Sequence, residues 1–112
     1  MDILTIPQSR TDQRGNVVEV AYSSNLTAVD FISQTRFHAE IQIAYVPGET
    51  IINWSSVADW LTSFAHEEVI LEELAQTVFD KLREVVEGAP VRVTITVTSG
   101  QMGNVSVTAM SQ

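Results

Sequence analysis

The sequence contains no cysteine, and this absence excludes several kinds of chemistry together. Without a thiol the chain has no disulfide, no thiolate nucleophile and no cysteine-bound zinc. Cationic side chains are also scarce, with 6 Lys and Arg against 14 Asp and Glu, which makes the net charge −8. Such a charge repels phosphate backbones and anionic membrane surfaces, so we expect neither nucleic acid nor a membrane as a partner.

Long hydrophobic runs are missing as well. No stretch of about 18 apolar residues could span a bilayer, and the opening MDILTIPQSR lacks a basic leader followed by an apolar segment. We therefore expect a cytoplasmic protein. With 112 residues, of which 45% are hydrophobic, the chain suits a single domain over residues 1–112.

Hydrophobic periodicity predicts four strands. The clearest alternation places Val91, Val93, Ile95 and Val97 between polar residues. Small polar residues at 23–27 are typical of a loop. Strands are expected over residues 16–22, 36–46, 91–98 and 104–110.

Two helices are predicted between the second and third strands. The first begins near Ser55 or Ser56, either of which could cap it, and the second covers residues 67–87. The order β-β-α-α-β-β predicts an α+β fold, an antiparallel sheet with both helices on one face. Because the other face and the sheet edges would then be open, we expect a homo-oligomer that closes into a ring or barrel. The alternative is a monomer whose outer sheet face is polar.

The middle of the chain resembles two enzyme families. Residues 37–74 align without gaps with part of GTP cyclohydrolase I, and residues 45–82 look equally similar to the nitrile reductases that act on 7-cyano-7-deazaguanine. Both families belong to the tunnelling-fold (T-fold) superfamily, whose small subunits form rings and bind planar purine-like or pterin-like molecules at subunit interfaces. The positions that match GTP cyclohydrolase I are Tyr45, Val46, Pro47, Ser55, Ala58, Ala65, Glu72 and Leu74.

This resemblance implies that Glu72 anchors such a ring. An ionised carboxylate is a pure acceptor and can take two parallel hydrogen bonds from a guanine-like edge. Trp54, which could stack on a flat ring, and His66 are further candidate ligand-binding residues. The alternative interpretation is that Glu72 is a surface residue in the acid-rich start of a helix.

The residues that perform catalysis in these families are absent. Residues 30–36 stand where GTP cyclohydrolase I has a Cys-Glu-His-His run, and the cysteine loop of the nitrile reductases is shortened at the same place. Their nicotinamide-binding motif is replaced by residues 53–59, and Ser99 and Gln101 stand where the related dihydroneopterin aldolases use a lysine. We therefore expect neither a metal nor a cofactor.

Three hypotheses follow. The first is a divergent T-fold protein that binds a purine-like or pterin-like small molecule through Glu72. The second is a deazaguanine- or pterin-pathway enzyme without cysteine chemistry, whose candidate catalytic residues are His38, Glu40 and Asp30. His38 and Glu40 lie two apart on one strand face, where a histidine base could be oriented by a carboxylate. The third hypothesis is a non-catalytic structural subunit.

Overall fold

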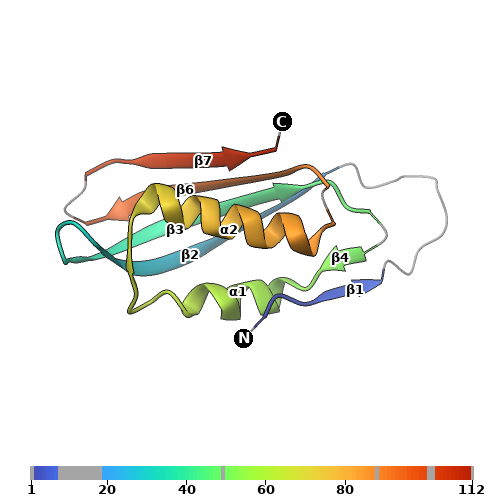
Figure 1. The fold of residues 1–112 in the computed structure, drawn as a ribbon, viewed down its shortest axis with the longest axis horizontal. Helices are drawn as coiled ribbons and strands as arrows, with labels where there is room; N and C mark the ends of the chain where they lie inside the picture. Colours follow the sequence, from blue (N-terminus) through green and yellow to red (C-terminus); the bar gives the residue numbers. More distant parts are fainter. Residues whose placement is uncertain (1, 8–18, 49, 88, 101–102, 112) are drawn as a thin grey trace.

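The chain forms an α+β fold (Figure 1). Along the sequence, two long strands precede the two helices and two more follow them. The structure is a computed structural model that describes residues 2–7, 19–48, 50–87, 89–100 and 103–111. The predicted order β-β-α-α-β-β is confirmed for β2, β3, α1, α2, β6 and β7, and three short strands are added to it. The elements are β1 (Thr5–Pro7), β2 (Val20–Asp30), β3 (Arg36–Tyr45), β4 (Thr50–Ile52), α1 (Trp54–Thr62), β5 (Glu68–Val69), α2 (Leu71–Val85), β6 (Val91–Ser99) and β7 (Ser106–Met110).

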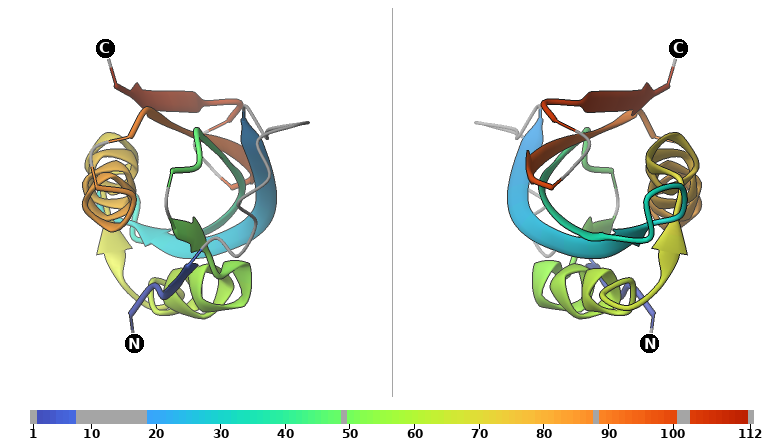
Figure 2. Two further views of the ribbon diagram at one scale, coloured as in Figure 1. Left: turned by 90° about the vertical axis from the view of Figure 1, so that its right-hand side faces the viewer. Right: turned by 90° about the vertical axis from the view of Figure 1, so that its left-hand side faces the viewer.

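The main sheet has the strand order β5-β2-β3-β6-β7. All neighbours are antiparallel except β5, which runs parallel to the end of β2. The sheet is strongly curled (Figure 2), and its register shifts once, between His38 and Ala39. A second sheet pairs β1 with β4 and holds the beginning of the chain against the segment before α1.

Both helices cover the same face of the main sheet (Figure 2). Helix α1 contacts β2, whereas α2 contacts β6 and β7. The alternation in β6 explains this layering, since Val91, Val93, Ile95 and Val97 are buried beneath α2 while Arg92 is exposed on the opposite face. That opposite face is called the open face below.

The loop predicted at residues 23–27 is wrong, because β2 continues through it. Residues 20–29 pair one to one with β3, from Val20 opposite Tyr45 to Val29 opposite Arg36. Leu26 and Ala28 are buried in the core, so two inward-facing apolar residues and a full-length partner strand outweigh the polar composition. Residues 16–18 of the predicted strand lie outside the described part of the chain.

Both helices begin at other residues than predicted. Helix α1 is capped by Asn53, whose side-chain oxygen accepts the backbone N–H of Ser56 at 3.2 Å, and not by Ser55 or Ser56. The Ser56 hydroxyl instead accepts the backbone N–H of Leu4 at 2.8 Å. Helix α2 begins at Leu71, four residues later than expected, because Glu68 and Val69 form β5.

Two sheet edges are open in the described structure. β2 is paired on its outer side only at Val29 and Asp30, where β5 lies. The outer side of β7 has no partner strand within the described residues. No helix in the described ranges is both long and apolar enough to cross a membrane.

Candidate functional site

A hollow of about 410 Å³ lies where the β2–β3 turn meets the beginning of α2. Apolar side chains form much of its wall, and the carboxylates of Glu67, Glu68 and Glu73 also line it. We call it the α2 hollow. Its lining residues are Phe31, Phe64, Glu67, Glu68, Val69, Ile70, Glu73, Leu74 and Thr77.

Backbone hydrogen bonds hold the two sides of the α2 hollow together. The N–H of Phe31 donates to the carbonyl oxygen of Val69 at 2.9 Å, and the N–H of Val29 donates to that of Glu67 at 3.0 Å. These bonds continue the parallel pairing of β2 with β5. Phe31 is therefore fixed beside the beginning of α2 although its side chain is 53% exposed.

Asp30 stabilises the turn that carries Phe31. Its carboxylate accepts the backbone N–H of Ser33 at 3.0 Å, and its side chain is buried. Hydrogen bonds from the hydroxyl and then the backbone amide of Ser33 lower the pKa of Asp30 below its usual value of 3.8. Asp30 is consequently ionised at neutral pH and engaged in the turn; a catalytic role for it stays a prediction.

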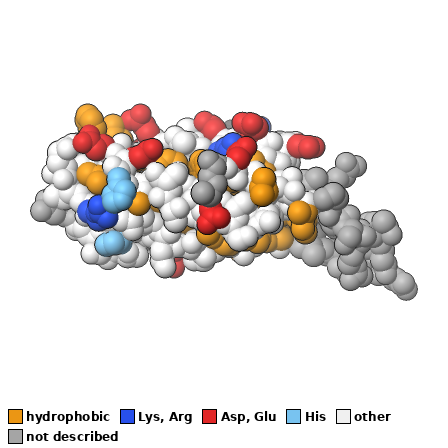
Figure 3. All heavy atoms as spheres, turned by 90° about the horizontal axis from the view of Figure 1, so that it is seen from below, with side chains coloured by type: hydrophobic (Ala, Val, Ile, Leu, Met, Phe, Trp, Pro, Cys, Tyr) orange, Lys and Arg blue, Asp and Glu red, His pale blue; other side chains and the backbone are white. Residues whose placement is uncertain are grey.

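Glu72 and His66 lie at the same end of the molecule as the α2 hollow. Glu72 is exposed in the first turn of α2, next to Glu73, which lines the hollow. His66 is exposed as well, and its Nδ1 lies 3.2 Å from a guanidinium nitrogen of Arg36. Acidic side chains are spread over the surface seen from below, with a small group of Arg and His at one end (Figure 3).

Trp54 lies far from the α2 hollow within one chain. It stacks on Tyr22, with ring centroids 4.3 Å apart, and meets Tyr45 edge to face at 5.8 Å. Tyr22 is eight positions from Asp30 along β2, which corresponds to about 26 Å. Trp54 and Glu72 could therefore contact one small molecule only if they came from different copies of the chain.

His38 and Glu40 occupy the open face of the sheet, away from the α2 hollow. The Nδ1 of His38 lies 3.1 Å from the Thr27 hydroxyl, and Glu40 accepts a hydrogen bond from the Gln42 amide at 3.2 Å. Neither side chain hydrogen-bonds to the other. Across the described residues, no cluster of three or more His, Asp or Glu side chains is arranged to hold a metal ion.

Sequence reasoning did not single out Phe31, Glu67 or Glu73 as lining a common site. Phe31 stood in a segment that was compared only with the missing metal ligands and the shortened cysteine loop of the related enzymes. The carboxylates belonged to a run of acidic residues that the sequence did not distinguish from one another. Their common position depends on β5, which is two residues long and has no periodicity of its own.

The curled antiparallel sheet with two helices on one face defines a T-fold protein. A crystal structure of "the archaeosine synthase QueF-Like in the apo form" superimposes with a TM-score of 0.77 and 24% sequence identity, covering 86% of this chain and 95% of that chain. A family profile described as "QueF-like protein" matches residues 37–112, more than half of the chain. The chain therefore belongs to the QueF-like family. Among curated proteins, none matches this sequence.

Proposed function

We propose that this protein binds a purine-like or pterin-like small molecule related to deazaguanine chemistry, within an assembly of several copies. The main observation that supports this proposal is the α2 hollow, in which apolar and aromatic side chains lie beside carboxylates at the beginning of α2. A flat ring can pack against Phe31 while its N–H groups donate to a carboxylate. The QueF-like family and the archaeosine synthase neighbour support a ligand of this class.

The anchoring residue in this proposal is Glu72, as the resemblance implies. Glu67, Glu68 and Glu73 are alternatives, because all three line the α2 hollow whereas Glu72 stands beside it. In an assembly, a neighbouring copy would add a second wall near Glu72, and Trp54 or His66 could then contact the same ligand. A carboxylate sheltered in this way makes stronger hydrogen bonds than one in water.

The proposed assembly is a ring of copies joined edge to edge. β2 and β7 offer the two open edges, and strand directions alternate from β2 through β3 and β6 to β7. The β7 strand of one copy would therefore run antiparallel to β2 of the next, which continues the pattern. Such pairing satisfies exposed backbone groups that otherwise invite aggregation. Sedimentation velocity should find several copies per particle; a monomer at all concentrations would refute the ring.

Binding is tested by calorimetry of the full chain with guanine, a 7-deazaguanine, a pterin and GTP. Hydrogen–deuterium exchange with the tightest of these ligands then locates the site. We expect added protection in peptides that cover residues 29–35 and 64–75, where the α2 hollow lies. No heat of binding with any of the four molecules would contradict the proposal and favour a non-catalytic structural subunit.

An enzyme of the deazaguanine or pterin pathways is the second candidate function. It is favoured by His38 and Glu40, which extend from the same face of β3 two residues apart. In this case His38→Ala should abolish turnover of the bound ligand while leaving its affinity unchanged. Unchanged turnover in His38→Ala, Glu40→Gln and Asp30→Asn would remove all three residues from consideration.

A further inference from the structure

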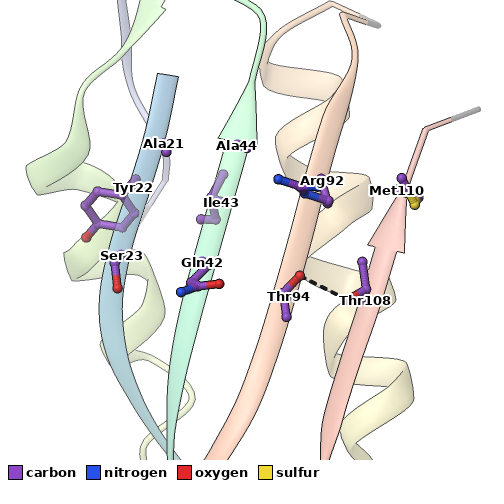
Figure 4. A pocket seen from close by; sticks show the side chains of 10 residues that line it. All are labelled: Ala21, Tyr22, Ser23, Gln42, Ile43, Ala44, Arg92, Thr94, Thr108 and Met110. Atoms are coloured by element: carbon purple, nitrogen blue, oxygen red, sulfur yellow. Dashed lines mark hydrogen bonds between the residues drawn. The ribbon is translucent and has the colours of Figure 1, made fainter. Parts of the chain in front are cut away.

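The open face of the sheet contains a second, larger hollow, of about 640 Å³, which the proposed function does not use (Figure 4). It extends over four strands, from β2 through β3 and β6 to β7. We call it the open-face hollow. Its lining residues are Ala21, Tyr22, Ser23, Gln42, Ile43, Ala44, Arg92, Thr94, Thr108 and Met110.

One row of polar side chains crosses all four strands on this face. Ser23 is paired with Gln42, Gln42 with Thr94, and Thr94 with Thr108. Directly opposed residues share one face of a sheet, so these four side chains stand side by side. The Thr94 and Thr108 hydroxyl oxygens are 3.0 Å apart (Figure 4). Since only one of these hydroxyls donates to the other, a hydroxyl hydrogen remains free for a ligand.

The adjacent row explains why the face is hollow. Ala21 is paired with Ala44, Ala44 with Arg92, and Arg92 with Met110. The two alanines leave space that longer side chains would fill, and Arg92 and Met110 stand beside it (Figure 4). The hollow therefore combines a small apolar floor with a guanidinium on one side and hydroxyl and amide groups on the other.

Among the residues that the structure describes, Arg92 is the only charged one that lines the open-face hollow. Its guanidinium makes no hydrogen bond or ion pair with another described residue. Glu40 lies four positions along β3 from Ala44, the partner of Arg92, which is about 13 Å and beyond the range of unscreened interaction in physiological salt. Glu19 is the nearer carboxylate, since it lines a smaller adjoining hollow with Arg92, without an ion pair between them.

We propose that the open-face hollow binds an oxyanion, the phosphate or carboxylate group of a small molecule, with Arg92 as its principal ligand. A guanidinium presents paired donors that match two oxygens of such a group. The hydroxyls of Ser23, Thr94 and Thr108 add neutral donors beside it. The net charge of the protein is −8, but the described lining of this hollow contains one cation and no carboxylate, so an anion meets little local repulsion there.

This site is separate from the α2 hollow and does not depend on the function proposed for it. Edge-to-edge assembly would also leave the open-face hollow accessible, because strand pairing uses the backbone groups at the margins of the sheet. An oxyanion bound here is expected to respond to changes at Arg92 and not to changes at Glu72.

The test is nuclear magnetic resonance of the deuterated full chain while sodium chloride is replaced by sodium phosphate, or by sodium acetate, at constant ionic strength. Backbone amides of Ser23, Arg92, Thr94 and Thr108 should shift and saturate. Arg92→Gln should weaken phosphate binding about tenfold or more. Arg92→Lys should retain part of the affinity, since it keeps the charge and loses only the paired donors.

Two further variants make the result specific. Glu19→Gln should strengthen phosphate binding, because it removes a carboxylate that lines the adjoining hollow with Arg92, whereas Arg83→Gln, an exposed arginine on α2, should change nothing. Saturating shifts with both salts would identify any oxyanion as the ligand, and shifts with phosphate alone would identify a phosphate group. Absence of saturation with either salt, or equal affinity in Arg92→Gln, would overturn the inference.

Discussion

Tyr22 and Trp54 stack face to face, with ring planes only 7° apart. The pair joins β2, whose outer edge is open, to the first residue of α1. Trp54 and Tyr45 also meet edge to face, so two neighbours of Trp54 are aromatic rings of its own chain. This packing anchors α1 on the sheet, and a ligand could stack on Trp54 only from the side that Tyr22 does not cover.

Loss of this stack should destabilise the protein. Trp54 is half-buried, so Trp54→Ala is expected to lower the free energy of unfolding by about 2–3 kcal/mol, below the range of a fully buried tryptophan. Urea unfolding followed by circular dichroism measures the change, and Trp54→Phe should lose less. If Trp54→Phe kept its stability but lost ligand affinity, Trp54 would be a ligand contact as well.

The hydroxyl of Tyr45 should contribute to stability, whereas that of Tyr22 should not. Tyr45 accepts the backbone N–H of Ile52 at 3.1 Å in the buried core. Tyr45→Phe leaves this N–H unsatisfied, so we expect a loss of about 1–3 kcal/mol. Tyr22→Phe is the matched control, because the Tyr22 hydroxyl bonds to no described residue. Equal effects of the two substitutions in urea unfolding would contradict this account.

A methyl group at Gly100 should not be tolerated. A Cβ built there would lie 2.8 Å from the Cβ of Phe37, a buried residue that has little room to move. Gly100→Ala is expected to cost about 1–3 kcal/mol, the usual effect of overpacking. At Gly48 a Cβ would meet nothing within 4 Å, so Gly48→Ala should be nearly neutral. Thermal unfolding midpoints of the two variants measure the difference, and equal midpoints would contradict this expectation.

Asp30 should make the stability of the fold sensitive to acid. Its pKa is lower in the folded chain than its usual value of 3.8, because Ser33 donates hydrogen bonds to the ionised form. The resulting stabilisation is present above the unfolded-state pKa and is lost as the pH falls through the lower folded-state pKa. Asp30→Asn should therefore be less stable at pH 7 and lose less stability than the wild type between about pH 5 and pH 2. Parallel urea-unfolding curves for the two proteins across that range would contradict the role of Asp30.

Much of the fold was predictable because its main elements have strong periodicity. β3 alternates as far as Ile43 and β6 over most of its length, and α2 carries an apolar stripe, so their type and order followed from the sequence. The region after Tyr22 did not, since Ser23, Ser24 and Asn25 are typical loop residues and become a strand only through pairing with β3. β5 was missed for a related reason: its two residues are defined by hydrogen bonds to a distant strand.

The candidate residues predicted from the sequence lie partly near the beginning of α2 and partly elsewhere, as Trp54 does. The resemblance pointed to the beginning of α2, where Glu72 and His66 do lie, yet it could not rank the neighbouring acids. Which carboxylates line the α2 hollow depends on how β5 directs the chain into α2. Phe31 enters the site because the β2–β3 turn reaches the same place.

Whether Glu72 anchors the ring is tested most directly by the affinity of Glu72→Gln for the tightest purine-like or pterin-like ligand, measured by calorimetry beside Glu67→Gln, Glu68→Gln and Glu73→Gln. Glu84→Gln, an exposed position near the other end of α2, is the control. We predict that Glu72→Gln weakens binding about 100-fold, the effect of losing charge-assisted hydrogen bonds, while Glu84→Gln binds like the wild type. Wild-type affinity in Glu72→Gln would contradict its role as the anchor, and wild-type affinity in all four variants at the beginning of α2 would contradict the site itself.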